Sequence, residues 1–322
     1  MEILDKIYGN SYISEPILIE LIQSLPVQRL KYISQQGLPQ EYYHRPVFSR
    51  FEHSLGVLSL LRKMGANLEE QVAGILHDVS HTCFSHVIDW VLGDPTKEDY
   101  QDKSHEKTLE KENISSILIK HNFDWKRIHR LENFGLLERE IPELCADRVD
   151  YTLREFPDKK ASREIVTGLG NYDGKMAFSS IESAERFAKG YVLCQEEHWA
   201  GNEARARYFL LAKAIKKSLE KKYVDKKDFL KTDSEVMDLM LTSGDKEVLN
   251  ILFILKQPLE IYEVRDESVE GIVIPKKIRY VDPAIYRKGT IQTLSEISSG
   301  YAQILKEQKI NSEKKIKIRG FN

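Results

Sequence analysis

The sequence of 322 residues has little of several features that would assign a chain to a particular class of protein. Its three cysteines, Cys83, Cys145 and Cys194, are odd in number, far apart and without a CxxC pair. A disulfide framework or a cysteine zinc site is therefore not expected. Lys and Arg total 48 against 50 Asp and Glu, which gives a net charge of −2. This balance excludes a chain held to nucleic acid mainly by overall positive charge; a local basic patch stays open, but binding to nucleic acid is not indicated.

Long apolar segments and common catalytic loops are also lacking. The purely apolar runs are short, such as 251–255, whereas a membrane span needs about 20 residues. The first ten residues, MEILDKIYGN, include early acidic side chains, and no apolar core of a secretory signal follows them. We therefore expect a cytoplasmic protein with no membrane partner. There is no Gly-rich phosphate loop, GxSxG elbow, GxGxxG or HExxH motif.

What the chain does have is helical periodicity over most of its first 255 residues. The ranges expected to be helical are 17–25, 27–33, 50–64, 68–79, 107–120, 125–131, 141–156, 180–198, 203–223 and 246–255. After Gln257-Pro258 the pattern changes to short β-branched or aromatic segments. The strands expected there are 259–264, 271–275, 277–281 and 314–320, with a helix over 291–308 between them. The sequence thus predicts a mainly α protein, with a helical domain over 1–256 and a small C-terminal α+β lobe over 257–322.

Histidines are concentrated in one stretch, because six of the nine fall within residues 44–105. They are His44, His53, His77, His81, His86 and His105. Gly65, at the turn between two expected helices, lies twelve residues after His53 and twelve before His77. Each histidine is then roughly 18 Å from the turn, so an antiparallel helical hairpin places the two side by side. Surface or cap roles would be the better reading of any single histidine, but they do not account for this matched arrangement.

Carboxylates accompany these histidines, although adjacent helical residues differ by about 100°, so His77 and Asp78 can approach one ion only at its edge. Asp78 follows His77, and His81 shares the face of His77 if the helix continues that far. Imidazole with carboxylate suits one first-row divalent metal such as Mn, Fe, Ni, Co or Zn. A further ligand is expected from Asp147, which shares a helix face with Tyr151, Arg154 and Glu155. Read alone, Asp147 would be an exposed acid at better than even odds.

At these residues the sequence resembles the HD-domain metal phosphohydrolases. The segments that carry the resemblance are RFEHSLGV (50–57), ILHDVSHTCFSH (75–86), the pair His105-Glu106 and ADRVDY (146–151), with DKIYG (5–9), QRLKYISQQG (28–37) and KIRYVDPAI (277–285) also similar. The similarity is greatest to the branch with bacterial deoxyguanosine triphosphate triphosphohydrolases and the animal deoxynucleotide triphosphohydrolase that carries a sterile-alpha-motif domain. The resemblance implies an HD-domain helical bundle, a homo-oligomer, and one metal held by His53, His77, Asp78 and Asp147.

The resemblance also implies roles for the surrounding residues. His105 would deliver a proton to the leaving group, and His81 and His86 would line the phosphate site, with His81 and Asp78 counted among the catalytic residues. The implied substrate contacts are Gln35 at the sugar edge, Arg50 and Arg148 on phosphate, Tyr151 against the sugar and Glu155 in place of an Asp that reads the sugar 3′-hydroxyl. Mg²⁺ could accompany the substrate phosphates. For Arg205 and Arg207 we expect a solvated helix face, with a phosphate contact as the alternative; His121 and His129 are expected on the surface.

Departures from the branch leave the substrate open. Ser80-His81-Thr82-Cys83 stands where Gly-His-Gly-Pro is usual, Arg148 replaces a lysine, and Gln36 replaces an apolar residue. The leading hypothesis is hydrolysis of (deoxy)nucleoside triphosphates by attack of a metal-bound water on phosphorus. One alternative is a nucleoside monophosphatase or a broader phosphatase. The other is a catalytically idle HD module that senses nucleotide or binds nucleic acid through its Lys-rich stretches, 216–228 and 306–319.

Overall fold

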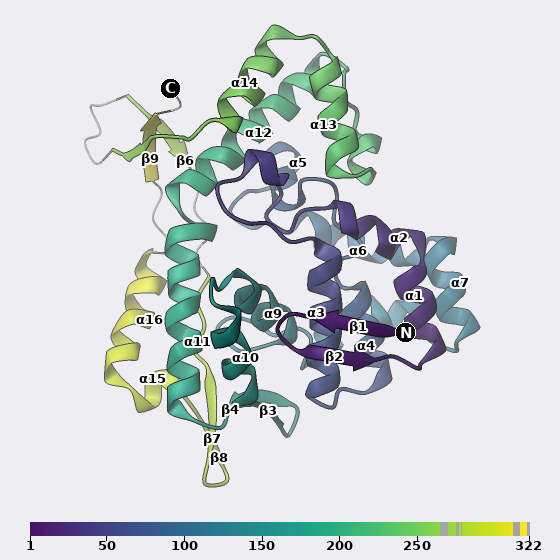
Figure 1. Ribbon diagram of the computed structural model, residues 1–322, viewed down its shortest axis with the longest axis vertical. Helices are drawn as coiled ribbons and strands as arrows, with labels where there is room; N and C mark the ends of the chain where they lie inside the picture. Colours follow the sequence, from purple (N-terminus) through teal and green to yellow (C-terminus); the bar gives the residue numbers. More distant parts are fainter. Residues whose placement is uncertain (265–269, 275–276, 278, 312–315, 321–322) are drawn as a thin grey trace.

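The computed structural model describes residues 1–264, 270–274, 277, 279–311 and 316–320 and confirms the mainly α fold class (Figure 1). The α-helices of the N-terminal half are α1 (Pro16–Gln23), α2 (Leu25–Arg29), α3 (Arg50–Lys63), α4 (Leu68–Leu76), α5 (Asp89–Leu92), α6 (Tyr100–Glu110), α7 (Glu112–Lys120), α8 (Trp125–Ile128) and α9 (Ala146–Glu155). The later ones are α10 (Lys159–Thr167), α11 (Ile181–Cys194), α12 (Asn202–Glu220), α13 (Asp233–Thr242), α14 (Lys246–Lys256), α15 (Leu294–Ile297) and α16 (Ser299–Asn311). No described helix has the length and apolar character needed to cross a membrane.

The α3–α4 hairpin forms as its sequence predicts. A capping box starts α3, because Ser49 Oγ accepts the backbone N–H of Glu52 and the Glu52 carboxylate accepts that of Ser49. Gly65, with a φ of +72°, supplies the left-handed residue at the turn, and the Asn67 side chain caps α4. Helix α4 ends at Leu76, with His77 as its cap, and not at Val79 as expected. The expected single helix over 107–120 is likewise divided between α6 and α7.

The described strands form three small sheets. They are β1 (Glu2–Asp5) with β2 (Gly9–Tyr12); β3 (Leu169–Tyr172), β4 (Lys175–Phe178), β7 (Ala284–Arg287) and β8 (Thr290–Thr293) in the order β3-β4-β7-β8; and β5 (Ile261–Glu263), β9 (Ile316–Gly320) and β6 (Ile272–Ile274) in the order β5-β9-β6. β4 pairs in parallel with β7, with Phe178 opposite Ile285, and the other pairs are antiparallel. The hairpin of β7 and β8, in the C-terminal region, therefore extends the sheet that begins with β3 at residue 169.

Two expectations for the C-terminal region are wrong. Residues 277 and 279–281 are not in a strand, and Ile278 lies outside the described residues. The helix expected over 291–308 begins only at Leu294, because Ile291 belongs to β8 and Thr293 caps α15 in a capping box with Glu296. The boundary between residues 256 and 257 stays a proposal, since the described strands beyond it belong to two sheets, one of them shared with β3 and β4.

Two hydrophobic clusters make up the core. One packs α1, α3, α4, α9 and α11 together, and the other joins α12, α13 and α14 to the segments around Leu30 and Phe84. In Figure 1, α13 and α14 lie at one end of the molecule, while α11 and α16 run side by side toward the other. Phe51 packs against both clusters. Its neighbour Arg50 and the start of α3 therefore lie where the two clusters meet.

Candidate active site

Three of the four predicted metal ligands converge from three helices. His53 lies in the first turns of α3, His77 caps the end of α4, and Asp147 lies in the first turn of α9. The Nε2 atom of His53 is 2.9 Å from Asp147 Oδ1 and 3.2 Å from His77 Nε2, and His77 Nε2 is 3.6 Å from the same carboxylate oxygen. These atoms lie within 4.8 Å of one another, which is the clustering that one metal ion requires.

The other ring nitrogens fix both histidines in the metal-binding tautomer. His77 Nδ1 donates to the carbonyl of Gly74 at 2.8 Å, and His53 Nδ1 lies 2.7 Å from Asp150 Oδ2. Both Nε2 atoms therefore carry lone pairs when the rings are neutral, and these face each other and a carboxylate. Although burial opposes protonation, the hydrogen bonds to Asp147 and Asp150 raise the pKa of His53 to about 9. Two imidazole nitrogens and a carboxylate oxygen face one another, so a positive charge between them is stabilised. These donors therefore fit a divalent metal.

Asp78 lies at the edge of this cluster. Its carboxylate oxygens are 3.6 Å from His77 Nε2 and 3.8 Å from His53 Nε2. Oδ2 accepts a 2.6 Å hydrogen bond from Arg50 Nη1, while Oδ1 lies 3.3 Å from His81 Nε2. Burial would raise the pKa of Asp78, but Arg50 and the neighbouring histidines hold it well below its usual value. Asp78 is thus ionised beside the three converging ligands, and its role as a fourth ligand stays a prediction.

A cleft of about 1040 Å³ opens over these residues, enough for a ligand the size of a nucleotide. The predicted site residues that line it are Gln35, Arg50, His77, Asp78, His81, His86, His105, Asp147, Arg148 and Tyr151. Glu155 is not among the lining residues, and its contact with a sugar hydroxyl stays a prediction. Its carboxylate accepts from Gln36 Nε2 at 2.5 Å and lies 2.9 Å from His198 Nδ1. Two departures from the family pattern, Gln36 and Glu155, therefore pair with each other outside the cleft.

The predicted phosphate-binding arginines are largely engaged within the protein. Arg50 is 1% exposed and bonds Ser85 as well as Asp78. Arg148 donates to the backbone carbonyls of Arg139 and Glu143 and so tethers the segment before α9. Arg50 therefore acts first as a positioning group, whereas the Nε of Arg148 has no hydrogen-bond partner among the described residues.

The prediction that Arg205 and Arg207 lie on a solvated helix face is wrong, because these residues are 1% and 4% exposed. Arg205 pairs with Glu98 at 3.0 Å, and Arg207 bonds the backbone carbonyls of Tyr42, Leu255 and Gln257. Both guanidiniums are therefore buried structural groups, and the phosphate contact that was the alternative is not supported either.

Four further histidines, His81, His86, His105 and His129, line the cleft. The ring nitrogens of His105 lie 3.1 Å from the Leu76 carbonyl and 3.2 Å from that of His129, and a neutral ring can donate to only one of them. Burial lowers the pKa of His105. Burial and Arg50 lower the pKa of His81 well below its usual value, and its ring lies 5.1 Å from that of His86. His129 is half-buried and lies at the cleft surface.

Several functional residues were not predicted. Asp150 holds His53 and is itself held by Arg154 Nε at 2.7 Å, while Arg154 Nη2 reaches Asp5 of β1 at 2.5 Å. The spacing of Asp147 and Asp150, three residues apart on one helix, was a signal that could have found this contact. Glu138 lines the cleft near Asp147, and burial together with that carboxylate raises its pKa to about 7. Glu138 lies in an irregular segment, so no helical spacing relates it to the other site residues.

Tyr151, which lines the cleft as expected, is held by aromatic neighbours. Its hydroxyl is 3.1 Å from that of Tyr191, and its ring lies edge-on to Trp199 with 5.1 Å between centroids. The His53 and Tyr151 rings are 6.4 Å apart. An aromatic surface thus stands next to the predicted metal ligands, where a flat or sugar-like group could pack.

Comparison with known proteins agrees with this geometry. The HD domain family matches residues 50–155, which include all four predicted ligands. The chain is 37% identical over 292 residues to the uncharacterized protein YdhJ of Bacillus subtilis, with 89% of each chain covered. It is 31% identical over 304 residues to the metal-dependent phosphohydrolase cns2 of Cordyceps militaris, covering 90% of this chain and 86% of cns2.

Two further matches differ in extent. A phosphohydrolase structure from Bacteroides thetaiotaomicron superposes with a TM-score of 0.64 over 99% of both chains at 19% identity, which shows a shared fold. The bovine deoxynucleoside triphosphate triphosphohydrolase SAMHD1 is 34% identical over 100 residues, covering 26% of this chain and 17% of that protein. The chain therefore belongs to the HD-domain family of metal-dependent phosphohydrolases.

Proposed function

We propose that this HD-domain phosphohydrolase acts on nucleotides and uses a single divalent transition metal. The observation that carries the proposal is the convergence of His53, His77 and Asp147, with both imidazole tautomers fixed, under a cleft of about 1040 Å³. A divalent metal in such a site lowers the pKa of water and polarises a phosphoryl oxygen. A cytoplasmic location and a homo-oligomeric assembly belong to the same proposal and rest on composition and on the family resemblance.

The side chains around the ligands have separable tasks in this proposal. Arg50 holds the Asp78 carboxylate against the cluster, so Asp78 can orient a water or bind the metal as a fourth ligand. Tyr151 offers its ring to the sugar. His105 is the proposed proton donor to the leaving oxygen, which requires its Nε2–H to turn from the Leu76 carbonyl into the cleft.

The length of the phosphate chain separates two candidate substrates. The family resemblance and the partial match to SAMHD1 support a nucleoside triphosphate. The charges of the cleft favour a nucleoside monophosphate, because acidic side chains outnumber Lys and Arg among its lining residues and Arg50 is held by Asp78. Those acidic residues include Glu98, Asp102, Glu138 and Glu140. A triphosphate would need more uncompensated positive charge than a monophosphate.

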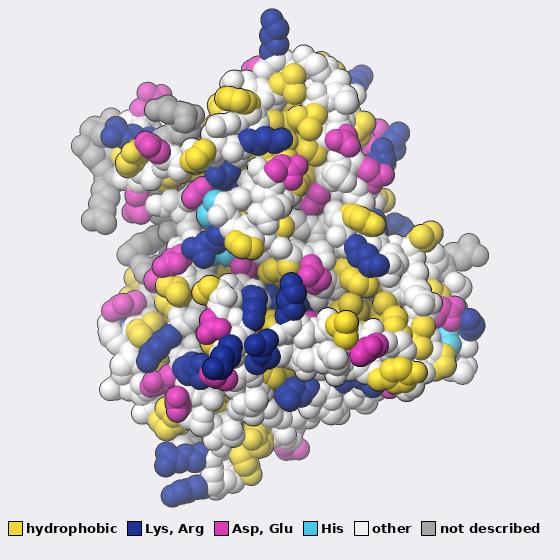
Figure 2. All heavy atoms as spheres, in the orientation of Figure 1, with side chains coloured by type: hydrophobic (Ala, Val, Ile, Leu, Met, Phe, Trp, Pro, Cys, Tyr) yellow, Lys and Arg dark blue, Asp and Glu magenta, His cyan; other side chains and the backbone are white. Residues whose placement is uncertain are grey.

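The nucleic-acid-binding alternative has less support. In the Lys-rich stretch at 216–228, Lys217 pairs with Glu247 and Lys221 with Asp245. Figure 2 shows Lys and Arg side chains over the region of α10 and α11, interleaved with acidic ones. Among them, Arg186 pairs with Glu164 at 3.0 Å. Basic groups that are paired in this way do not form the continuous positive stripe that tracks a phosphate backbone.

The test is a product analysis of the metal-loaded protein. The chain, stripped with a chelator and reconstituted separately with Mn²⁺, Fe²⁺, Co²⁺, Ni²⁺ and Zn²⁺, would be incubated with ribo- and deoxynucleoside mono-, di- and triphosphates. Release of intact triphosphate supports the first candidate, and release of orthophosphate from monophosphates supports the second. If no metal gives turnover of any nucleotide, the proposal fails.

A further inference from the structure

Two cations reach the cleft from a part of the chain far from the metal ligands. Lys277 and Arg279 line the same cleft as His77 and Asp147. Gln195, in the π-helical turn Gln195–Trp199 that follows α11, holds their backbone from both sides. Its Oε1 accepts the N–H of Arg279 at 3.0 Å, and its Nε2 donates to the Lys277 carbonyl at 3.2 Å. The fold thus fixes this segment against the catalytic body.

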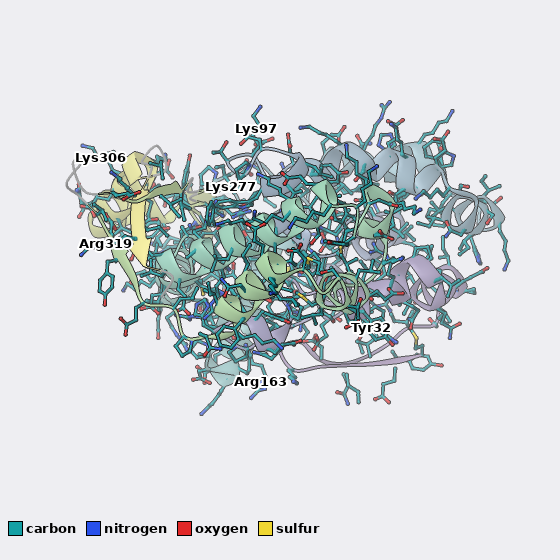
Figure 3. All side chains as sticks on the ribbon, turned by 90° about the horizontal axis from the view of Figure 1, so that it is seen from above. Tyr32, Lys97, Arg163, Lys277, Lys306 and Arg319 are labelled. Carbon is teal, nitrogen blue, oxygen red and sulfur yellow. The ribbon has the colours of Figure 1, made fainter. Side chains whose placement is uncertain are left out.

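The side chains of this segment gather around Glu98, which is 6% exposed. Arg279 Nη2 lies 2.5 Å from Glu98, Arg205 3.0 Å and Lys277 Nζ 3.8 Å, so three cations surround one carboxylate. Lys277 also donates to the Lys97 carbonyl, and Figure 3 shows these two residues close together at one side of the molecule. Glu98 itself has a φ of +53°, a left-handed conformation that is unfavourable outside glycine and is found at functional sites.

The cations differ in what they can offer a ligand. Arg205 is 1% exposed and stacks over Trp90, so it serves the core. Arg279 and Lys277 face the cleft, where Asp102 also stands, and Asp89 contributes to the field at Lys277. Burial and the adjacent Arg279 lower the pKa of Lys277 to about 8, while Glu98 and Asp102 oppose the shift.

We propose that Lys277 and Arg279 form an anion subsite that binds a phosphate group of the substrate, an inference that rests on the proposed function. The planar guanidinium of Arg279 can donate two hydrogen bonds to phosphate oxygens, and Lys277 adds a point charge. The subsite would add positive charge to that of Arg50, which is held by Asp78 and Ser85 deep in the cleft, and to that of Arg148. Specificity for the anionic end of the substrate would then come from the C-terminal region and not from the helices that hold the metal.

A purely structural role, in which the two cations only neutralise Glu98, makes a different prediction. Such a role would affect stability but not the affinity for phosphate. The experiment therefore titrates the metal-loaded protein with inorganic phosphate by calorimetry, for wild type, Arg279→Ala, Arg279→Lys and Lys277→Ala. Arg287→Ala, an exposed position on β7, is the matched control. Melting temperature and metal content are measured for each variant.

Arg279→Ala and Lys277→Ala are expected to weaken phosphate binding about tenfold or more, with Arg279→Lys intermediate and Arg287→Ala unchanged. On the nucleotide that the panel identifies, the same variants should raise KM by a similar factor and change kcat much less. If Arg279→Ala does not fold, Lys277→Ala decides, since its side chain is 28% exposed. Wild-type phosphate affinity in a folded, metal-loaded Lys277→Ala protein would overturn the inference.

The two proposals can fail separately. If wild type hydrolyses nucleotides while the variants bind phosphate equally well, only the subsite is wrong. If wild type hydrolyses nothing but the variants lose phosphate affinity, only the proposed function is wrong. A metal-loaded wild type that binds no phosphate overturns the subsite, whether or not it is active.

Discussion

The two sides of the cleft are built differently. On the metal side, His53, His77 and Asp147 are fixed by helix ends, and the outer nitrogen of each imidazole is held by another group. The opposite side is made of irregular segments around Glu98 and Lys277, joined by ion pairs between residues distant in sequence. Rigid helices suit a metal site, because its ligands must be held in a fixed geometry. The loops and ion pairs of the other side are where a change of substrate would cost the fold least.

Removal of a metal ligand should have the largest effect. Asp147→Ala leaves two imidazole lone pairs without the carboxylate that completes the site. Because bound metal contributes several kcal/mol of transition-state stabilisation, we expect kcat/KM to fall about 10³-fold or more. The assay is steady-state hydrolysis of the identified nucleotide, with Asp238→Ala, an exposed acid of α13, as the control. Activity within tenfold of wild type would contradict the assignment of the metal side.

A smaller effect is expected at Asp150, which holds the imidazole of His53 in place. Asp150→Asn removes the charge that holds His53 Nδ1 and pairs with Arg154. Loss of such a partner typically costs 10- to 100-fold in metal affinity. Competition with a fluorescent chelator measures this, and Glu182→Gln, exposed at the start of α11, should leave the affinity unchanged. If Asp150→Asn bound metal like wild type, the rigidity attributed to this side would have another source.

Close packing of α3 against α9 gives a third test. A Cβ on Gly56 would lie 1.9 Å from Arg154 Nη2 and 2.1 Å from Asp150 Oδ1. Gly56→Ala should therefore lower the free energy of unfolding by about 1–3 kcal/mol through overpacking, and weaken metal binding as well. Gly300→Ala, in α16, meets only a Ser298 Oγ at 4.0 Å and should be neutral or stabilising. Denaturant unfolding compares them, and equal stability of the two variants would show that the contact relaxes freely.

The smallest effect on catalysis is expected at Glu155. Because its carboxylate pairs with Gln36 and His198 and does not line the cleft, Glu155→Gln should leave KM within about threefold. The loss of the ion pair should instead lower stability by about 1–2 kcal/mol. A tenfold rise in KM with unchanged stability would restore the sugar contact that the family resemblance implies.

The pairing of His53 with His77 could be predicted from sequence because its geometry is local, whereas Asp147 lies 94 residues from His53 in the chain. Twelve residues on either side of Gly65 place His53 beside His77, and the helix that bears Asp147 packs against α3. The continuation of α4 to Val79 was wrong because His77 already caps the helix at Leu76. Periodicity does not show where the last helical turn ends when the following residues are also buried.

The substrate side could not be predicted because its contacts are tertiary. Arg50 and Arg148 lie in segments that resemble the family, yet in the structure Arg50 bonds Asp78 and Arg148 bonds backbone carbonyls. Lys277 and Arg279 approach the cleft through Gln195, more than 80 residues earlier in the chain. No local pattern encodes such a contact. In the sequence, Gln36 and Glu155 were two separate departures from the family pattern, and nothing indicated that they pair with each other.

Metal analysis tests the central claim most directly. Wild-type protein, His53→Ala and Asp238→Ala would be reconstituted with each divalent metal, desalted and measured by inductively coupled plasma mass spectrometry. The geometry predicts about one ion per chain in wild type and in Asp238→Ala, and well under half of that in His53→Ala. A wild type that retains no divalent metal, or a His53→Ala protein that retains as much as wild type, would contradict the metal centre.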